Sequence, residues 1–311
     1  MDPTTLTDLL LANEPMIRLT FFLGVLAAMA IWENAMPRRR RQFPRAIRWT
    51  NNLGIVVVDT IALRLVVPVL AVGLALVAKE RGWGLLNVVG MPAWLGLIVS
   101  VLVLDLAIYL QHVMFHAVPA LWRLHRMHHA DLDFDVTTGL RFHPIEILLS
   151  MGIKLVVVAA LGPPAIAVLI FEVVLNATSM FNHGNVRIPA GVDRVLRWFI
   201  VTPDMHRVHH SIDPAETNSN FGFNLPWWDR VLGTYRDHPT DGHEAMTIGI
   251  AQFRDRRDLW LDRMLIQPLR GPSAGYAINR EQRLGAKPSS VAAETVAVPQ
   301  AAGNGDPMIK R

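Results

Sequence analysis

The sequence contains no cysteine among its 311 residues. This absence excludes disulfide bonds, iron–sulfur clusters and thiolate metal ligands. Charged residues are also scarce, at 18% of the chain, whereas hydrophobic residues make up 51% and the mean hydropathy is +0.29. A soluble domain of this length needs more polar surface to cover its core, and the apolar residues here are clustered. The composition therefore predicts a protein embedded in a membrane.

The apolar stretches predict an all-α fold, a polytopic membrane bundle of about four spans over residues 16–32, 53–78, 94–116 and 145–181. Pro68 interrupts the second span. The sequence Gly162-Pro163-Pro164 breaks the last one, which is either a tight helical hairpin or a re-entrant pair. We expect residues 1–15 to be an N-terminal segment and residues 16–270 to form one membrane domain. Residues 271–311 are rich in Ala, Pro, Gly and Ser and are predicted to be a disordered tail.

Basic residues are concentrated between the first two predicted spans, at Arg38, Arg39, Arg40, Arg41, Arg45 and Arg48. Positive charge beside membrane helices marks the cytoplasmic side, so the net charge of +4 indicates topology and not a nucleic-acid partner. The third span then runs inward and places residues from His112 onward at the cytoplasmic face. In a bacterium this would be the inner membrane.

The chain has twelve histidines, and none precedes His112. Most fall into three short motifs, His112-x3-His116, His125-x2-His128-His129 and His206-x2-His209-His210. Residues three or four apart on a helix share a face. We therefore expect the first histidine of each motif to lie beside the later ones, and the three motifs to converge in a helical cap on the cytosolic side.

So many imidazoles exceed the needs of one ion, because a catalytic zinc site commonly uses three protein ligands. They suit two ions that each keep an open position. Imidazole accepts zinc, copper, iron or nickel, so the ligand type alone does not name the metal. The carboxylate-bridged bundle architecture is excluded, because no Glu-x-x-His motif occurs in the chain. Protonated histidines packed together would repel unless something held them neutral, and we predict that metal ions do so.

These motifs, in this order and spacing, resemble the fatty acid hydroxylase / sterol desaturase superfamily over residues 100–236. The resemblance extends to Asp105-x3-Tyr109, Arg141-Phe-His143-Pro-Ile-Glu146, Phe181-Asn-His183-Gly184, Thr202-Pro-Asp-Met, Asn220-Phe-Gly222 and Trp228-Asp229-x3-Gly233-Thr234.

The resemblance implies a non-haem centre of two iron ions that activates O2 at the cytoplasmic membrane face. The implied ligands are His112, His116, His125, His128, His129, His183, His206, His209 and His210. Some members carry a further histidine four residues before His183, where this chain has Ser179.

Other residues are candidates for positions beside the ligands or along the substrate, namely Asp105, Tyr109, His143, Glu146, Asn182, Asn220, Trp228 and Asp229. Asp105 would accept the free N–H of a ligand imidazole or make a helix-packing hydrogen bond. His143 precedes Pro144 and would cap the next helix. Glu146 and Glu172 are candidates for a carboxylate near the metals. Trp227, Trp228 and Asp229 are expected to close the cap, and His238 and His243 to be exposed to solvent.

The resemblance implies O2-dependent hydroxylation or desaturation of a membrane lipid, such as a sterol, a fatty acyl chain or an ether lipid. The His-Pro-Gly-Gly signature of a fused haem domain is absent, so electrons would come from a separate donor protein or a reduced pterin. The alternative is a histidine-rich metal transporter or metal-binding protein without redox chemistry. A transporter should place its ligands near the bilayer midplane on broken helices.

Overall fold

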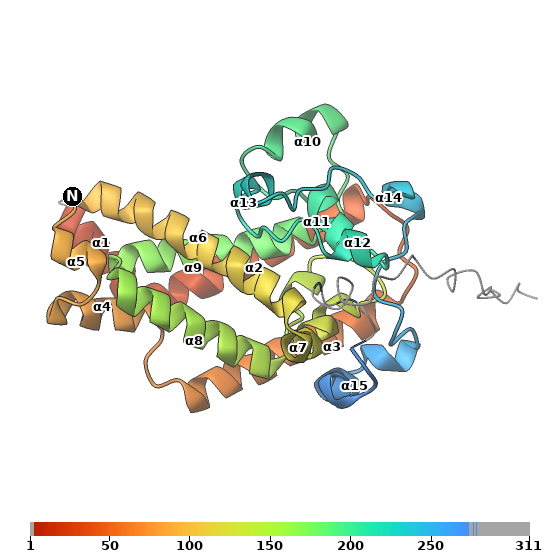
Figure 1. The fold of residues 1–311 in the computed structure, drawn as a ribbon, viewed down its shortest axis with the longest axis horizontal. Coiled ribbons are helices and arrows are strands. Elements are labelled where there is room, and N and C mark those ends of the chain that lie inside the picture. The colour runs from red at the N-terminus through yellow and green to blue at the C-terminus, as the bar shows by residue number, and fades with distance from the viewer. Residues whose placement is uncertain (1–2, 274–275, 277, 279–311) are drawn as a thin grey trace, which may run out of the picture.

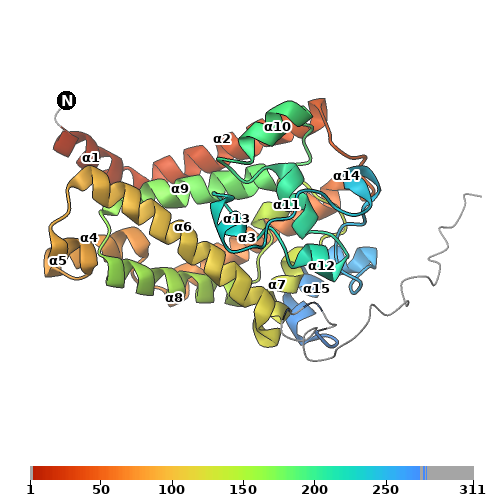
Figure 2. The same ribbon diagram turned by 45° about the horizontal axis from the view of Figure 1, so that its top comes forward.

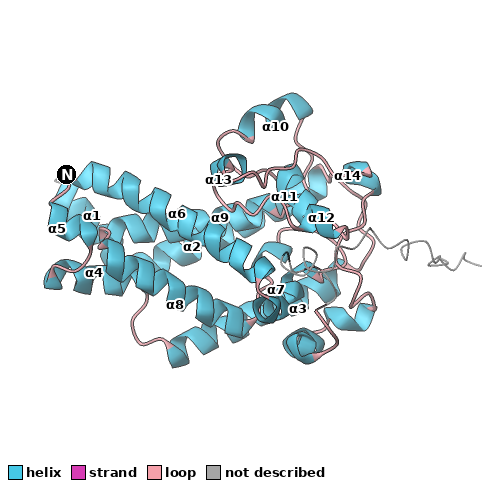
Figure 3. Ribbon diagram, viewed as in Figure 1, coloured by secondary structure: helices cyan, strands magenta, loops and turns pink. Residues whose placement is uncertain are grey.

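The computed structural model describes residues 3–273, 276 and 278, and within them it contains helices and no β-strand (Figures 1 and 3). The α-helices are α1 (Pro3–Ala12), α2 (Glu14–Ala35), α3 (Arg45–Val66), α4 (Ala71–Arg81), α5 (Leu85–Val89), α6 (Ala93–Ala117), α7 (Pro119–His129), α8 (Pro144–Leu161), α9 (Ala165–Asn182), α10 (Ala190–Leu196), α11 (Pro203–His209), α12 (Pro214–Thr217), α13 (Trp227–Val231), α14 (Gly242–Ala245) and α15 (Leu261–Ile266). Three short 3-10 helices are η1 (Thr138–Leu140), η2 (Arg256–Leu259) and η3 (Gln267–Leu269).

Within the described part of the chain, five segments are long and apolar enough to cross a membrane, namely Glu14–Ala35, Arg45–Val89, Ala93–Ala117, Pro144–Leu161 and Ala165–Asn182. The second comprises α3, α4 and α5, and its break between Val66 and Ala71 contains Pro68, as predicted. The all-α polytopic bundle is confirmed. It has five candidate spans where about four were expected, because the apolar stretch 145–181 forms two separate helices.

The junction between α8 and α9 follows from its local sequence. Gly162 ends α8 in the left-handed conformation, with φ of 65°, and Pro164 precedes the first turn of α9. A Cβ atom at Gly162 would collide with the carbonyl oxygen of Trp83, and one at Gly84 would collide with the backbone of Gly162. Glycine is therefore required where these two loops meet at the end of the bundle remote from the histidines.

The core of the bundle lies where α4 and α6 pack against both α8 and α9. Small residues of α4, including Ala71 and Ala75, allow close approach to Val158 of α8 and Phe171 of α9. The outer faces of the long helices keep large apolar side chains exposed, such as Ile31, Leu65 and Val156. This distribution suits helices surrounded by lipid.

The opposite end of the bundle carries a polar cap, made of α7 with the loop to His143 and of the chain after α9 (Figure 2). The arginine-rich segment lies at this same end. Arg48 forms ion pairs with Asp131 at 2.7 Å and Asp135 at 2.5 Å, and Arg38 pairs with Asp204 at 3.2 Å. The predicted basic segment and the histidine motifs therefore share one end of the molecule.

Most of the predicted tail, residues 279–311, lies outside the described residues. Tyr276 belongs to the predicted tail but is described by the structure. It is buried, with its ring stacked on Trp122 at 5.6 Å. Its hydroxyl donates a hydrogen bond to the carbonyl of Ile212. The cap therefore extends beyond residue 270.

Candidate metal centre

The first two histidine motifs lie on consecutive helices. His112 and His116 occupy the last turns of α6, and the chain bends at Val118 before Pro119 opens α7. His125 and the pair His128–His129 fall on the last turns of α7. All these imidazoles are buried.

The remaining predicted ligands come from the end of α9 and the chain after it. His183 directly follows α9 as its C-cap. Thr202 caps α11 by accepting a hydrogen bond from the Met205 amide, and Pro203 is the first helical residue. The Thr-Pro-Asp-Met sequence is therefore a helix start that sets the direction of His206 and the residues after it.

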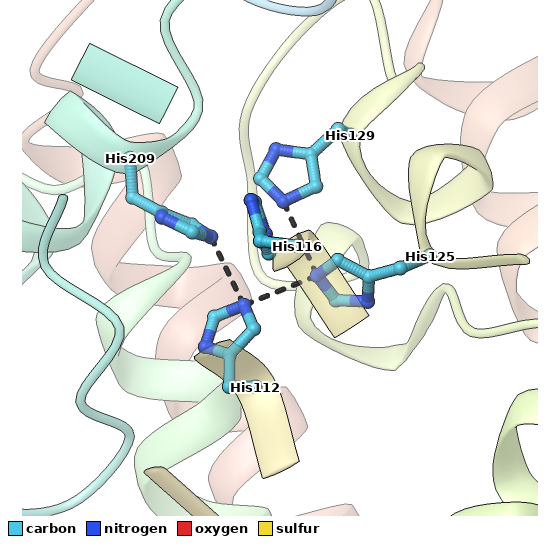
Figure 4. A group of neighbouring side chains, drawn as sticks. All are labelled: His112, His116, His125, His129 and His209. Carbon is cyan, nitrogen blue, oxygen red and sulfur yellow. Dashed lines mark hydrogen bonds between the residues drawn. The ribbon is translucent and has the colours of Figure 1, made fainter. Parts of the chain in front are cut away.

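The nine predicted ligand residues divide into two groups within which the candidate ligand atoms lie within 4.8 Å of one another. The five-histidine group contains His112, His116, His125, His129 and His209 (Figure 4). The four-histidine group contains His128, His183, His206 and His210. The two groups adjoin, because the rings of His129 and His210 stack at 4.5 Å.

In the five-histidine group the Nε2 atoms point at one another. His112 Nε2 lies 3.1 Å from His125 Nε2 and 3.0 Å from His209 Nε2. His129 Nε2 lies 3.2 Å from His125 Nε2, and Figure 4 marks these three contacts. The buried Nε2 of His116 has no hydrogen-bond partner among the described residues.

The four-histidine group converges on His183. Its Nε2 lies 3.1 Å from the Nε2 atoms of His128, His206 and His210. A neutral imidazole carries one N–H, so a single ring cannot satisfy three such contacts by donating hydrogen bonds. Lone pairs gathered around one point instead fit a cation at that point.

The outer nitrogens support this interpretation, because six Nδ1 atoms lie against oxygen atoms. The pairs are His112 with Phe221 O at 2.7 Å, His116 with Asn218 Oδ1 at 3.2 Å, His125 with Glu146 Oε1 at 2.6 Å, His128 with Arg141 O at 3.2 Å, His183 with Ser179 O at 2.7 Å and His209 with Ser219 O at 2.7 Å. Each pair holds the proton on Nδ1 and leaves the inward Nε2 lone pair free to bind metal. The donor set therefore fits two metal ions.

The electrostatics favour the same protonation state. Burial lowers the pKa of His125 and of His183 to about 3. Burial also lowers the pKa of five further predicted ligands well below the usual value, namely His128, His129, His206, His209 and His210. These side chains are neutral near pH 7, and neutral imidazole is the form that binds metal.

Two carboxylates that were predicted beside the ligands have different partners. Glu146, in the first turn of α8, accepts the hydrogen bond from His125. Asp105 instead accepts from the indole Nε1 of Trp228, at 2.8 Å, while His112 uses the Phe221 carbonyl. Of the two roles expected for Asp105, the structure therefore shows the packing hydrogen bond.

The Trp-Asp motif acts on the loop that carries the Phe221 carbonyl. Asp229 accepts hydrogen bonds from the amides of Phe221 at 2.8 Å and Gly222 at 2.9 Å, and from the Thr234 hydroxyl. The Tyr109 hydroxyl lies 2.8 Å from the same threonine oxygen. These residues hold the oxygen that orients His112 and do not enter either histidine group.

Two predicted asparagines hold backbone. Asn182 donates to the carbonyl of Phe223 at 3.0 Å. Asn220 has φ of 52° and donates to the carbonyls of Met205 and Arg236. Asparagine tolerates this left-handed conformation better than most residues.

His143 is the N-cap of α8, as predicted, and its Nε2 lies 3.1 Å from the carbonyl of Leu265. Glu172 forms ion pairs with Lys154 at 2.6 Å and Arg18 at 2.5 Å, and is not part of either histidine group.

His238 is exposed as expected. His243 was also expected at the surface, but it is buried next to Asp204, which pairs with Arg38 and Arg207.

Sequence reasoning missed the contacts behind the four-histidine group. Arg48 reaches across from α3 to Asp131 and Asp135, which flank Phe134. The Phe134 ring lies 5.5 Å from His183 and 5.2 Å from His210. The only sequence signal was the set of three aspartates that follows the second histidine motif, at positions 131, 133 and 135.

The membrane bundle therefore buries two adjoining groups of imidazoles at one end, and each group could hold a metal ion. Residues 97–234, which contain all nine histidines, match the family model for fatty acid hydroxylase. This segment of the chain belongs to that family.

Curated relatives agree. The chain is 31% identical to the ornithine lipid hydroxylase of Rhizobium tropici, over 48% of this chain and 44% of the relative. It is 30% identical to the alkylglycerol monooxygenase of Xenopus tropicalis, over 42% of this chain and 28% of the relative. It is 29% identical to human cholesterol 25-hydroxylase, over 43% of this chain and 49% of the relative. The chain thus spans less than half of the length of each relative. No solved structure matches it.

Proposed function

We propose that this protein is a membrane oxidoreductase that uses O2 to hydroxylate a lipid at a centre of two iron ions. The observation that carries the proposal is the convergence of nine buried imidazoles into two adjoining groups at one end of a membrane bundle. The five-histidine group would hold one ion and the four-histidine group the other. Iron bound there would supply the redox chemistry that activates O2.

The protein's own part is to orient the ligands and to exclude water. Oxygen atoms fix the Nδ1 side of six imidazoles, as described above. Aromatic rings cover the groups, since Phe142 stacks on His128 at 4.5 Å and Phe221 lies 5.4 Å from His112. A dry, rigid surrounding of this kind protects reactive species from side reactions with water.

Hydroxylation is favoured over desaturation because the three named relatives are hydroxylases or monooxygenases. The names of these relatives refer to an ornithine lipid, an alkylglycerol and cholesterol, and each of these compounds has an apolar chain or ring system. We therefore propose a membrane lipid as the substrate. Insertion of one oxygen atom of O2 into a C–H bond and reduction of the other to water consumes two electrons, which would come from a separate donor protein or a reduced pterin.

We propose that the histidine end faces the cytoplasm. The arginine-rich segment contacts this end of the molecule, and clustered positive charge beside spans marks the cytoplasmic side. The transporter alternative is less well supported, because the histidine groups gather at the end of α6 and in the cap.

The test uses the purified full-length chain in lipid nanodiscs with a chemical reductant, lipid extract and 18O2. We expect about two irons per chain and one labelled oxygen atom per lipid product. His128→Ala should abolish labelling, whereas His238→Ala, an exposed histidine outside both groups, should not. Labelled product from folded His128→Ala protein would refute the assignment. Metal transport into liposomes without O2 uptake would favour the transporter.

A further inference from the structure

The cap has an apolar surface that the membrane spans do not explain. On and beside α10 and α13, six large apolar side chains are at least half exposed, namely Val192, Val195, Trp198, Phe199, Val231 and Leu232. We call these residues the α10–α13 patch. A contiguous apolar surface in water is unfavourable, and such surfaces usually meet another apolar phase.

The two parts of the patch form one surface. The Trp227 indole donates a hydrogen bond of 2.7 Å to the carbonyl of Trp198. Arg230 donates to the carbonyl of Arg197 at 3.0 Å, and its guanidinium lies 4.0 Å from the centre of the Trp198 ring. These contacts fix α13 against the chain that follows α10.

The depth of this surface follows from Asp105. This residue is the midpoint of α6, which runs from Ala93 to Ala117, and at 1.5 Å per residue it lies about 18 Å from either end. Its carboxylate accepts a hydrogen bond from Trp228 of α13. A hydrocarbon core is about 30 Å thick, so a residue bonded to the midpoint of a span lies well inside it.

A second contact gives the same result. Asn182 at the end of α9 donates to the carbonyl of Phe223, and Thr178, one turn deeper, donates to the Asn224 side chain. The segment from Phe223 to Trp228 therefore runs along α9 and α6 toward the middle of the bundle. Figures 1 and 2 both place α13 beside α6 and α9 and not beyond their ends.

We propose that the α10–α13 patch is immersed in the lipid leaflet on the histidine side, with acyl chains and not water against Val231 and Leu232. Trp198 and Trp227 suit this position, because indoles are enriched at the boundary between headgroups and acyl chains. The exposed Arg194 of α10 would reach toward lipid phosphates from the same part of the cap.

The immersed patch adjoins the metal centre. The loop that α13 braces carries Phe221 and Phe223, whose rings lie 5.4 Å and 5.2 Å from His112. If the proposed function holds, lipid chains lie against the elements that cover His112. The immersion itself depends on the membrane bundle and not on the metal chemistry.

The absence of native cysteine permits a direct test. Val231→Cys, 76% exposed in the wild type, is spin-labelled in the full-length chain in nanodiscs of phosphatidylcholine and phosphatidylglycerol. Collision with O2, which concentrates in lipid, is compared with collision with a water-soluble nickel chelate. Val57→Cys on α3 serves as the lipid-facing control, and Glu244→Cys on α14 as the aqueous control.

We expect position 231 to behave like position 57, with loss of nickel contact and strong relaxation by O2. Leu232→Cys should give the same result and replaces the first variant if that one fails to fold. Nickel access at 231 equal to that at 244 would overturn the proposal. Exclusion of both reagents would also overturn it, because a protein partner or second copy would then cover the patch. Neither result would bear on iron content or 18O2 labelling, so the two proposals can fail separately.

Discussion

The two histidine groups are built from the same motifs used in opposite ways. The motif on α7 contributes its first and last histidines, His125 and His129, to the five-histidine group and His128 to the other. The motif on α11 contributes His206 and His210 to the four-histidine group and His209 to the first. Adjacent residues on a helix point about 100° apart, so each His-His pair divides between neighbouring sites. Each His-x2-His-His motif therefore contributes imidazoles to both groups and connects them.

The two groups differ in the residues that hold their imidazoles in place. The five-histidine group is oriented by Glu146 and by the loop that Asp229 holds. Behind the four-histidine group lie the buried ion pairs of Arg48, and its centre is the single residue His183. We expect the smaller group to depend on fewer, more critical residues.

The largest effect should come from His183→Ala. This change removes the Nε2 atom that lies 3.1 Å from those of the three other histidines in the smaller group, so this group should hold its ion less tightly and metal content should fall from about two ions per chain toward one. Removal of a residue that only orients a ligand typically lowers activity by up to about 100-fold. Removal of a ligand itself should therefore lower activity by more than this. Iron analysis and turnover measure both.

His116→Ala is the matched control, because it leaves the larger group with four histidines, as many as the smaller group has in the wild type. It should retain more iron than His183→Ala. Equal loss of iron from the two variants would contradict the asymmetry between the groups.

Arg48→Met should have the second largest effect, which is a loss of thermal stability. Removing one partner of a buried ion pair leaves uncompensated charge and typically costs about 3–5 kcal/mol. Asp131 and Asp135 would be left buried, and the loop that holds Phe134 against His183 would loosen. Thermal unfolding in detergent measures the loss, and iron should be lost from the four-histidine group first.

Arg257→Met controls for loss of an arginine, because its pair with Asp262 is about half exposed. Such surface pairs contribute about 0–1 kcal/mol. Similar destabilisation by the two substitutions would show that the Arg48 network contributes no more than a surface pair.

Glu146→Ala should act on the five-histidine group. The carboxylate holds the proton on Nδ1 of His125 and so directs Nε2 inward. Loss of such a partner typically lowers metal affinity or activity about 10–100-fold. Glu146→Gln keeps an accepting oxygen and should recover part of the loss. Iron retention against a chelator and turnover are the measurements, and an unchanged Glu146→Ala variant would remove Glu146 from the centre.

The sequence was sufficient to predict the helical class and the residues that converge, because histidine spacing and long apolar runs are local signals. The sequence did not predict that the histidines of one motif would be divided between the two groups. His125 was expected beside both His128 and His129, and which imidazole joins which group depends on the helix opposite. That pairing is decided by tertiary packing.

The residues that orient the imidazoles were harder to predict for a related reason. His112 is oriented by the carbonyl of Phe221, and every residue has a carbonyl, so no residue type marks this partner. Asp105 was therefore a reasonable candidate, yet Trp228 is its partner. Arg48 was interpreted only as a topology signal, because nothing local connects it with Asp131, 83 residues further along the chain.

The smallest effect should come from Tyr109→Phe, which distinguishes support of the five-histidine group from chemistry within it. Thr234 donates its single hydroxyl proton to Asp229, so Tyr109 must donate to Thr234. Loss of one such hydrogen bond costs about 1 kcal/mol. We expect a small drop in thermal stability with iron content unchanged, because the Tyr109 hydroxyl lies outside both histidine groups. A large loss of turnover at full iron occupancy would instead assign Tyr109 a direct role in the reaction, and the loop around Phe221 would then be more than a support for His112.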